Sequence, residues 1–341
     1  MKAIILAAGK GTRMHPLTNQ IPKPLIPICN LPTLIFVIDK IINSGINRIG
    51  LVISPDFKES FDQFIKNFNL EKIVNIIIQE TPLGVAHAVK TAKSFIGNDD
   101  FLLYLGDNLI KDELEIFKNK FQDNHSDALL LLKEINDPKK FGVAQINNNN
   151  EIIGIEEKPK YPKSNLAVTG IYFFKNRILN EIDNIGFSKR GELEITDAIY
   201  NLVNNGLVKG HKLEGWWVDT GGREQVLEAN SLIMEEIVNG AYSNLFKDYT
   251  RKDKILIGLN TKIQNVKANG YAVIGHDSTL ISTTLENNVS ISSNSIITDS
   301  FISNSIILKK NHCKNFEIIN SLVGTKYKKD VNKKIKDIID A

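Results

Sequence analysis

The sequence predicts an α/β protein in which a doubly wound, mostly parallel sheet is followed by a parallel β-helix. Three observations support this fold class. Short apolar runs alternate with segments of helical period up to about residue 239, a polar stretch follows, and a short aliphatic repeat then begins at Ile257. A length of 341 residues exceeds the size at which one hydrophobic core stops growing, so two domains are expected.

The first part of the chain contains apolar runs rich in Ile, Val and Leu, which predict buried strands. Segments between them place apolar residues three and four apart, as helices lying on a sheet do. We expect strands at Ala3–Ala7, Arg48–Ile53, Val74–Ile78, Phe101–Leu105, Ala128–Leu132 and Val168–Phe174, and helices at Thr33–Ser44, Pro55–Phe68 and Val85–Phe95.

The last third of the chain carries a short repeat. Ile257-Gly258 and Ile274-Gly275 begin units that lie 17 residues apart, and each is followed six positions later by another aliphatic residue. Four further isoleucines recur at steps of six, five and five, with Ser, Asn and Asp between them. This period favours a parallel β-helix that stacks aliphatic residues inward over ordinary strands with polar loops.

These patterns set the expected domain boundaries. Residues 1–240 are expected to form the α/β domain and residues 241–254 a polar linker. Residues 255–325 form the β-helix. Residues 326–341 are rich in lysine, which indicates a solvated terminal helix or tail. The exposed end of a β-helix invites a partner, so the oligomeric state, including a homo-oligomer, stays open.

Composition excludes several classes of protein. The formal charge is only +3, with 42 basic and 39 acidic residues, so no overall field favours nucleic acid or an anionic membrane as partner. Two cysteines, Cys29 and Cys313, are too few for a disulfide framework and fit a reducing compartment. No run of about 18 apolar residues occurs, and Met1–Gly9 is too short for a signal peptide. We therefore expect a cytoplasmic protein.

A glycine loop, Ala8–Met14, follows the first predicted strand. Its glycines can bring backbone amides close to phosphate oxygens, although it matches neither a dinucleotide fingerprint nor a Walker loop. Arg13 lies in this loop, and Lys23 follows between two prolines. Two fixed cations beside a glycine loop suit a polyphosphate, whereas the alternative is a tight turn flanked by surface cations.

Two aspartates occupy matching places at strand ends. Asp107 directly follows Phe101–Leu105 at the carboxyl end of a buried strand, where open α/β sheets bind ligands, and Asp219 ends the run Trp216–Asp219. Two carboxylates could share one Mg²⁺ with substrate phosphates, since that ion takes few protein ligands. The alternative is that an aspartate after a strand caps the next helix.

Other polar residues indicate less when taken alone. Glu157-Lys158 could bind sugar hydroxyls and a phosphate, or could mark a solvated turn before a proline. Arg190–Asp197 is typical of a helix entry with acids in its first turn. His87 lies in a helical segment and is expected to be packed rather than catalytic. No nucleophile triad occurs, which suits direct nucleotidyl transfer because positioning and cations can supply most of the rate.

Together these residues resemble the bacterial sugar nucleotidyltransferases, most closely the long-form glucose-1-phosphate thymidylyltransferases, over nearly the whole chain. The family's signature loop corresponds to Leu6–Arg13 followed by Pro22-Lys23-Pro24, and Gln79–Ala88 is similar to its base-recognition segment. The resemblance implies a Rossmann-like catalytic fold and a left-handed β-helix. It also implies Mg²⁺ as cofactor, with a nucleoside triphosphate and a sugar 1-phosphate as substrates.

The resemblance also implies roles for individual residues. Gln79 would bond the pyrimidine edge, and Gly84 would let the backbone approach it. Asp107 and Asp219 would bind the metal. The catalytic cations would be Arg13 and Lys23; the nucleotide-binding residues Leu6, Ala8, Gly9, Gly11, Thr12, Gln79, Pro82 and Gly84; and the sugar-phosphate-binding residues Asn108, Gly142, Glu157, Lys158, Thr169, Tyr172 and Arg190.

Three positions depart from the family pattern. The short-form enzymes have a glycine where Ala8 stands and a tyrosine where Phe141 stands, and threonine is common where Gly222 stands. These departures concern base and sugar contacts and leave the cations and carboxylates in place.

The expected reaction converts dTTP and glucose 1-phosphate to dTDP-glucose and pyrophosphate. UTP or another sugar 1-phosphate remains an alternative, because one glutamine contact separates bases that differ by a methyl group only weakly. Acetyl transfer on the β-helix is less favoured, since His276 and His312 lack a catalytic context. A regulatory relative that binds nucleotide sugar without turnover is the alternative from another class.

Overall fold

The computed structural model describes residues 1–123, 125–325 and 328–336. Two compact units share the chain, and each consists of two sequence segments. Unit 1 contains Met1–Gly9 and Val37–Asp219, and unit 2 contains Lys10–Phe36 and Thr220–Ala341. These units therefore do not follow the boundary expected at residue 240, because the segment after β1 and the helix after β13 group with the β-helix.

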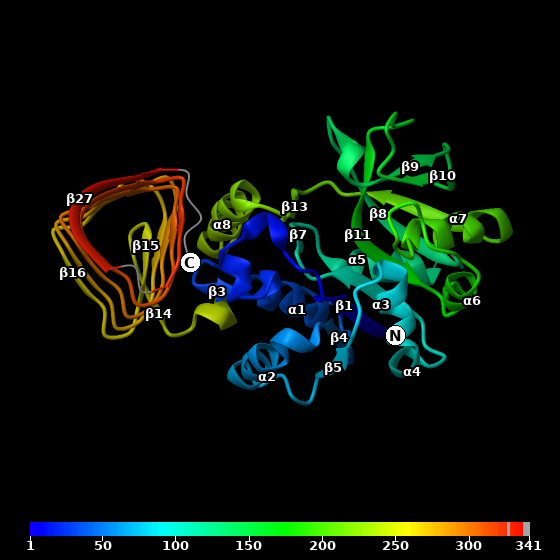
Figure 1. Cartoon of the computed structure of the whole chain (residues 1–341), viewed down its shortest axis with the longest axis horizontal. Helices are drawn as coiled ribbons and strands as arrows, with labels where there is room; N and C mark the ends of the chain where they lie inside the picture. Colours follow the sequence, from blue (N-terminus) through cyan, green and yellow to red (C-terminus); the bar gives the residue numbers. More distant parts are fainter. Residues whose placement is uncertain (124, 326–327, 337–341) are drawn as a thin grey trace. The chain divides into compact units, whose positions relative to one another are not determined.

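Unit 1 is built on one nine-stranded sheet (Figure 1). Strands β5, β4, β1 and β6 are neighbours in that order and run parallel, as the apolar runs predict. β11 then runs antiparallel to β6, and β8, β9, β10 and β12 complete the sheet. The strands are β1 (Lys2–Leu6), β4 (Ile49–Ile53), β5 (Val74–Ile78), β6 (Phe101–Leu105), β8 (Ala128–Glu134), β9 (Gly142–Ile146), β10 (Ile152–Glu157), β11 (Leu166–Phe174) and β12 (Val208–Lys212).

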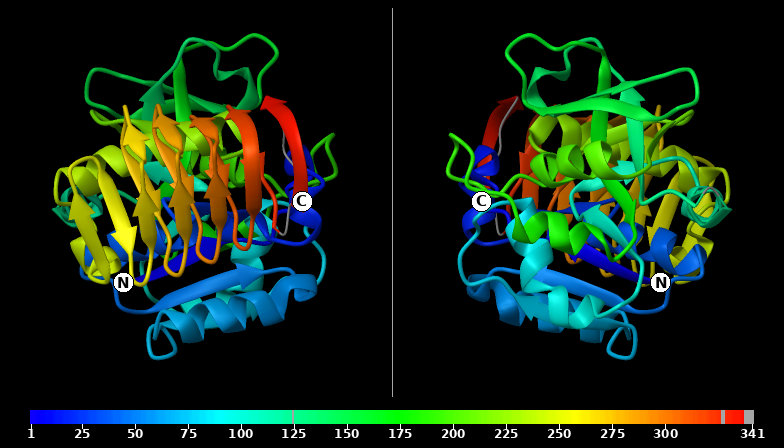
Figure 2. Two further views of the ribbon diagram at one scale, coloured as in Figure 1. Left: turned by 90° about the vertical axis from the view of Figure 1, so that its left-hand side faces the viewer. Right: turned by 90° about the vertical axis from the view of Figure 1, so that its right-hand side faces the viewer.

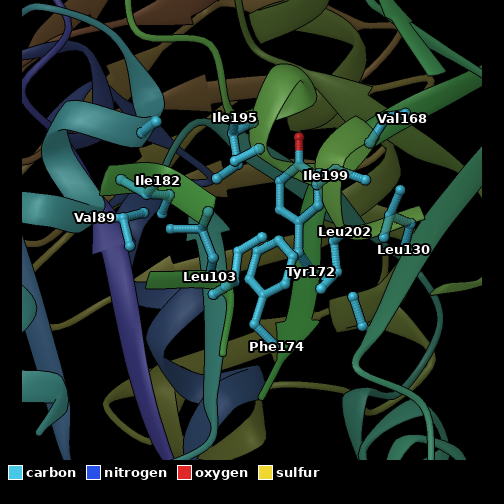
Figure 3. Close-up of a cluster of buried hydrophobic side chains, with 14 of the residues drawn as sticks. Val89, Leu103, Leu130, Val168, Tyr172, Phe174, Ile182, Ile195, Ile199 and Leu202 are labelled. Atoms are coloured by element: carbon cyan, nitrogen blue, oxygen red, sulfur yellow. The ribbon is translucent and has the colours of Figure 1, made fainter. Parts of the chain in front are cut away.

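Helices cover both faces of this sheet, and β11 shows why. Side chains alternate across a strand, and β11 is buried at every position. Tyr172 and Phe174 enter a cluster with α3, α4, α6 and α7 (Figure 3), whereas the ring of Phe173 meets that of Phe121 in α5 at 6.0 Å. The helices are α1 (Thr33–Asn43), α2 (Lys58–Asn67), α3 (Val85–Thr91), α4 (Lys93–Ile96), α5 (Leu114–Asp123), α6 (Ile178–Asp183) and α7 (Ile195–Asn205), with 3-10 turns η4 (Pro55–Phe57) and η5 (Pro138–Lys140).

A second, two-stranded ladder in unit 1 pairs β7 (Asn108–Ile110) with β13 (Trp217–Asp219). The strand pattern of the sequence gives no sign of it, because each member has only three residues. This ladder brings two distant parts of the chain together. Of the two predicted metal ligands, Asp219 ends β13 and Asp107 directly precedes β7.

Unit 2 joins the Lys10–Phe36 segment, helix α8 and the β-helix. A buried polar network holds them together: Asn230 of α8 accepts hydrogen bonds from Cys29 N (2.8 Å) and from the Ser290 hydroxyl (2.6 Å). Asn30 donates to the carbonyls of Val273 and Ile291 in neighbouring coils. The first elements are η1 (Thr12–Met14), η2 (Leu17–Asn19), η3 (Lys23–Leu25), β2 (Pro27–Ile28), β3 (Leu31–Pro32), α8 (Arg223–Val238), η6 (Ser243–Phe246) and β14 (Tyr249–Lys252).

The β-helix confirms the predicted repeat. Its short parallel strands stack in coils of 16 or 17 residues, and Figure 2 shows them side by side in yellow to red. Aliphatic residues form inward columns, one of which runs Ile257, Ile274, Ile291, Ile307 and Val323. The curled sheet matches a left-handed β-helix. Its strands are β15 (Ile255–Gly258), β16 (Lys262–Gln264), β17 (Lys267–Ala268), β18 (Ala272–Ile274), β19 (Thr279–Ile281), β20 (Thr284–Glu286), β21 (Val289–Ile291), β22 (Ile296–Thr298), β23 (Phe301–Ser303), β24 (Ile306–Ile307), β25 (His312–Ile319), β26 (Leu322–Val323) and β27 (Lys328–Lys336).

The small polar residues of the repeat have a structural use at the corners of the coils. Asn265, Asn294 and Asn304 take positive φ, a conformation that asparagine tolerates better than most residues. Hydroxyls inside the corners accept from the next coil, as Ser278 Oγ does from Ser295 N at 3.3 Å. The Ser and Asn content thus satisfies backbone groups that a tight coil would otherwise leave unpaired.

Two expectations from the sequence are wrong in part. Residues 328–336 form strand β27, not a helix, because Ile335 is buried and pairs with Ile318 in the last coil. Residues 326–327 and 337–341 lie outside the described residues. The expected linker at 241–254 contains η6 and β14, which pairs with β15. In the described part of the chain, no helix has both the length and the apolar character needed to cross a bilayer.

Candidate functional site

The carboxyl ends of four parallel strands meet at one edge of the sheet in unit 1. Beyond the strands, Ala7 N donates to Val52 O (2.8 Å), Gly106 N to Leu6 O (2.9 Å) and Gln79 N to Ile53 O (2.9 Å). The start of the glycine loop, the residue before Asp107 and the predicted base-contacting glutamine therefore follow adjacent strands. This is the edge at which open α/β sheets bind ligands.

The two predicted metal ligands lie on the β7–β13 ladder. Asp219 is the register partner of Asn108, so their side chains share one face, and Asp107 directly precedes Asn108. Asn108 Nδ2 donates to Asp107 Oδ1 at 2.9 Å, so the Asp107 carboxylate lies against the side chain of Asn108. The ladder thus places Asp107 and Asp219 next to the same residue, Asn108, from positions more than a hundred residues apart. Asp107 precedes a strand, and Gly222 rather than Asp219 is the N-cap of α8, so helix capping does not explain either one.

This donor set fits a magnesium ion better than a closed metal centre. Within the described residues, no three His, Cys, Asp or Glu side chains gather closely enough to hold a metal. Two half-buried carboxylates that both adjoin Asn108 match an ion that takes most of its oxygen ligands from water and substrate phosphates. The roles of Asp107 and Asp219 as ligands stay predictions.

An aromatic pair continues the site from the aspartates toward the predicted sugar-phosphate residues. Trp217 Nε1 donates to Asn108 Oδ1 at 2.8 Å, and its ring contacts that of Phe141 edge to face at 5.0 Å. Phe141 O in turn accepts from Lys158 N at 3.1 Å. These contacts connect Asp107 to Lys158 through three intermediates within one compact unit.

Around Glu157 the structure gathers several charged residues. Arg190 reaches Glu157 Oε1 at 3.2 Å, Glu192 at 3.0 Å and Glu194 at 3.5 Å, and Lys158 lies 3.4 Å from Glu157. The predicted sugar and phosphate residues thus lie together. Arg190 thus already faces three carboxylates.

The carboxylates of this cluster are crowded. Burial raises the pKa of Glu194, an effect that the hydrogen bond from Ser188 partly offsets and the charge of Glu157 reinforces. Burial and then the Glu157 charge likewise raise the pKa of Asp197 and of the Tyr172 phenol. Burial of the carboxyl groups, reinforced by the charge of Glu157, therefore disfavours their ionised forms.

Three of the predicted sugar-phosphate-binding residues, Gly142, Tyr172 and Thr169, have different surroundings. Gly142 pairs with Glu157 across β9 and β10, and a Cβ there would meet Thr196 Cγ2 at 3.1 Å and Glu157 Oε2 at 3.4 Å. Tyr172 is 4% exposed and lies among apolar side chains of β6, β8 and α7 (Figure 3). Thr169 is buried, and its hydroxyl donates to Leu131 O at 2.9 Å beside an irregularity in β11. Thr169 thus already uses its donor within the sheet.

The predicted base-recognition segment is hydrogen-bonded to the loop that carries Arg190 and Glu194. Leu193 N donates to Leu83 O (2.8 Å), and Ala86 N donates to Leu193 O (3.1 Å). Gly84 lies between them with φ 108°, and an added Cβ would lie 2.5 Å from Leu193 O. Only glycine fits there. Gln79 is 3% exposed, and its amide bonds the His87 ring, whereas Pro82 is exposed.

The two predicted cations belong to the loop in unit 2. Gly11 has a left-handed conformation with φ 62°, and its carbonyl accepts from Met14 N and from the Thr18 hydroxyl. A Cβ at Gly11 would lie 3.4 Å from Lys23 Cβ, so Lys23 adjoins the glycine turn as expected. Thr12 and Arg13 are exposed in η1. In unit 1, Leu6 ends β1, Ala8 is buried and Gly9 is exposed.

Sequence reasoning missed the partners of these residues. His87 was expected to be packed, but it bonds Gln79 across the turn between β5 and α3. Glu194 and Thr196 contact the cluster at Glu157, although the sequence shows them only as part of a helix entry. The Trp217–Phe141 contact depends on the short β13 strand, and no periodic pattern could have indicated it.

Comparison with known proteins identifies the family. The nucleotidyl transferase family model matches residues 2–236, which is more than half of the chain. This chain is a member of that family.

Individual relatives agree with this assignment. The nucleotidyltransferase is 37% identical over 240 residues to the low-salt glycan biosynthesis nucleotidyltransferase of Haloferax volcanii, covering 69% of this chain and 67% of the relative. It is 34% identical over 310 residues to a glucose-1-phosphate thymidylyltransferase of Streptomyces antibioticus, covering 90% and 87%. A Bacillus anthracis protein classed as a glucose-1-phosphate thymidylyltransferase and solved with a sucrose has a TM-score of 0.64 at 34% identity, covering 68% and 94%.

These comparisons confirm the enzyme class predicted from the residues. The nucleotidyltransferase has the Rossmann-like core of its family, and it is an enzyme of sugar-nucleotide synthesis. The family generally uses a divalent metal ion. The roles of individual site residues remain predictions.

Proposed function

We propose that this nucleotidyltransferase converts dTTP and glucose 1-phosphate to dTDP-glucose and pyrophosphate. The observation that carries the proposal is the pairing of Asp219 with Asn108, whose amide bonds Asp107 and Trp217 and is linked by contacts to Glu157 and Lys158. The Streptomyces antibioticus relative supports the choice of substrates because its similarity extends over 90% of the chain.

The proposed reaction is an in-line displacement. A phosphate oxygen of the sugar 1-phosphate attacks the α-phosphorus of the nucleotide, the bond to the β-phosphate oxygen breaks, and pyrophosphate leaves. Such transfer needs no protein nucleophile, because positioned cations stabilise the charge that develops on the phosphoryl oxygens. Asp107 and Asp219 would hold one Mg²⁺, which when bound neutralises phosphate oxygens.

Other residues of the chain bind and orient the substrates. Gln79 bonds the pyrimidine edge, and Gly84 leaves room for the base beside the backbone. Glu157 accepts hydrogen bonds from sugar hydroxyls, while Lys158 and Arg190 contact the sugar phosphate. Arg13 neutralises the departing pyrophosphate and Lys23 the reacting phosphates.

UTP is the second candidate nucleotide. Thymine and uracil present the same hydrogen-bonding edge and differ by one methyl group, whose burial contributes only about 1 kcal/mol. The Haloferax volcanii relative has a name that specifies neither base nor sugar, so it does not decide between them.

A crossed panel of substrates tests the proposal. Pyrophosphate release is measured with Mg²⁺, each of dTTP, UTP, CTP, ATP and GTP, and glucose, galactose and N-acetylglucosamine 1-phosphates. We expect the highest kcat/KM with dTTP and glucose 1-phosphate, and no release after chelation of the metal. Higher kcat/KM with another pair would reassign the substrates. Silence with every pair, together with tight binding of a nucleotide sugar, would favour a non-catalytic regulatory relative.

A further inference from the structure

His87 makes a side-chain contact with the amide of Gln79. Gln79 Nε2 lies 2.8 Å from His87 Nδ1. An amide nitrogen only donates, so in this arrangement His87 Nδ1 accepts, which requires the tautomer with its proton on Nε2. The amide nitrogen of Gln79 therefore points toward α3, and its oxygen occupies the other terminal position.

Other contacts leave Gln79 little freedom except rotation of this amide. Its backbone N–H is bonded to Ile53 O at 2.9 Å, and the residue is 3% exposed. The helix that carries His87 is held next to Leu193 through Ala86 N, and Thr91 Oγ1 donates to His87 O at 2.9 Å. These contacts hold the backbone that carries the His87 ring in place.

The orientation of a glutamine amide decides which pyrimidine it can read. Thymine and uracil carry an N3–H donor beside a carbonyl acceptor, whereas cytosine carries an N3 acceptor beside an amino donor. A carboxamide presents an acceptor and a donor side by side, so a half-turn about its last bond converts a reader of thymine or uracil into a reader of cytosine. An unrestrained glutamine is therefore a poor discriminator between these bases.

We infer that His87 is a specificity-determining positioning residue, which locks the Gln79 amide in the orientation that accepts thymine or uracil and rejects cytosine. This inference rests on the proposed base contact of Gln79. The inference includes the Nε2-protonated tautomer of His87. With that tautomer, the reversed orientation would set the amide oxygen against the lone pair of Nδ1, and in the observed orientation a cytosine would oppose donor to donor and acceptor to acceptor. Both mismatches favour thymine or uracil over cytosine, because buried polar groups left unpaired cost free energy.

Four proteins test the role of His87. His87→Leu removes the acceptor at similar volume. His87→Asp keeps an acceptor-only oxygen at the same number of bonds from the backbone as Nδ1. Thr91→Val, the matched control, removes the hydrogen bond to His87 O on the same helix and leaves the ring unchanged. For these and the wild type, kcat/KM is measured with UTP, dTTP and CTP at fixed glucose 1-phosphate and Mg²⁺.

The readout is the ratio of kcat/KM for UTP to that for CTP, which a general loss of folding does not move. We expect His87→Leu to lower this ratio at least about tenfold, or ~1.4 kcal/mol. His87→Asp should keep the ratio within about threefold, even where its added charge lowers kcat/KM for all nucleotides alike. Thr91→Val should keep it as well.

The inference is overturned if the wild type does not discriminate, if His87→Leu lowers UTP and CTP by the same factor, or if Thr91→Val shifts the ratio as much as His87→Leu. Calorimetric Kd values for UTP and CTP with Mg²⁺ provide the same ratio without turnover. A wild type that binds UTP selectively but releases no pyrophosphate would contradict the proposed function and leave the role of His87 supported.

Discussion

At the scale of single residues, Asn108 organises the metal end of the site. Its amide nitrogen donates to Asp107 and its amide oxygen accepts from Trp217, so both polar atoms are used. It also lies opposite Asp219 in the ladder. One buried asparagine therefore sets the direction of one carboxylate and fixes the ring that leads to Phe141.

The carboxyl cluster around Arg190 yields a prediction about pH. Burial raises the pKa of Glu194 above its ordinary value of 4.5, so the folded protein holds this proton more tightly than the unfolded chain does. Ionising Glu194 therefore costs stability as the pH rises above 4.5, and the cost persists at neutral pH. Glu194→Gln should remove it.

We thus expect Glu194→Gln to unfold at a higher temperature than the wild type at pH 7, with the difference shrinking as the pH falls toward 4.5. Thermal unfolding followed by circular dichroism across this range provides the measurement. A variant that is less stable than the wild type at pH 7, with a difference that does not depend on pH, would show that the ion pair with Arg190 outweighs the burial of the carboxylate.

At the scale of elements, the start of α3 connects the predicted base-recognition segment to the loop that carries Arg190 and Glu194. Gly84 is its N-cap; just before it Leu83 O accepts from Leu193 N, and two residues after it Ala86 N donates to Leu193 O. Backbone at φ 108° and ψ 173° is available almost only to glycine. The close approach of Leu193 O and the backbone conformation thus both require a glycine at position 84.

Gly84→Ala should therefore separate the two segments. We expect a loss of about 1–3 kcal/mol in the free energy of unfolding and a higher KM for the nucleotide. Gly186→Ala is the matched control, because it lies in the neighbouring loop with nothing within 4 Å of the added Cβ. Chemical denaturation and initial-rate kinetics measure both effects. Equal stability and KM in the two variants would contradict the account of α3.

Element by element, the sequence predicts what burial alone decides. β6 begins and ends as expected, since a continuous apolar run specifies a strand buried on both faces. β5 also has its expected bounds, although Asn75 is exposed and the strand lies at the edge of the sheet. β7 and β13 are too short for any period to appear, and their pairing follows from the fold as a whole. Asp107 and Asp219 were predictable as chemistry, whereas the Asn108, Trp217 and Phe141 contacts that join them to the sugar-phosphate residues were not.

The last coil of the β-helix is a second place where the local sequence pattern does not predict the observed strand. Residues 328–336 contain lysine at five positions, and charge composition favours a solvated segment. Burial of Ile335 against Ile318, together with the free edge of β25, instead favours a strand. Tertiary pairing overrides local composition here because a stack of coils offers unpaired backbone groups to the next segment.

At the scale of the whole molecule, the two units are interleaved along the chain. The Lys10–Phe36 segment leaves unit 1 after β1 and packs in unit 2, where Cys29 and Asn30 bond α8 and the β-helix. This segment carries both predicted catalytic cations. The β-helix therefore supports a part of the chain to which the sequence assigns catalysis.

Asn230→Ala tests this support. The change leaves Cys29 N–H and the Ser290 hydroxyl without their acceptor in a buried place, which should cost about 1–3 kcal/mol of unfolding free energy. We also expect lower kcat/KM. Asn43→Ala, an exposed asparagine whose contact is with Asp39 on its own helix, should change neither quantity. If Asn230→Ala kept full stability, the buried network would not hold the loop.

The shared metal site is the central claim, and a double-mutant cycle in the pyrophosphate-release assay tests it most directly. Asp107→Asn and Asp219→Asn should each lower kcat at least about 100-fold, or ~2.7 kcal/mol, with the fold retained. Because both carboxylates would hold one ion, the double variant should lose little more than either single one. Losses that multiply, or a single variant that keeps activity within about tenfold of the wild type, would contradict the account.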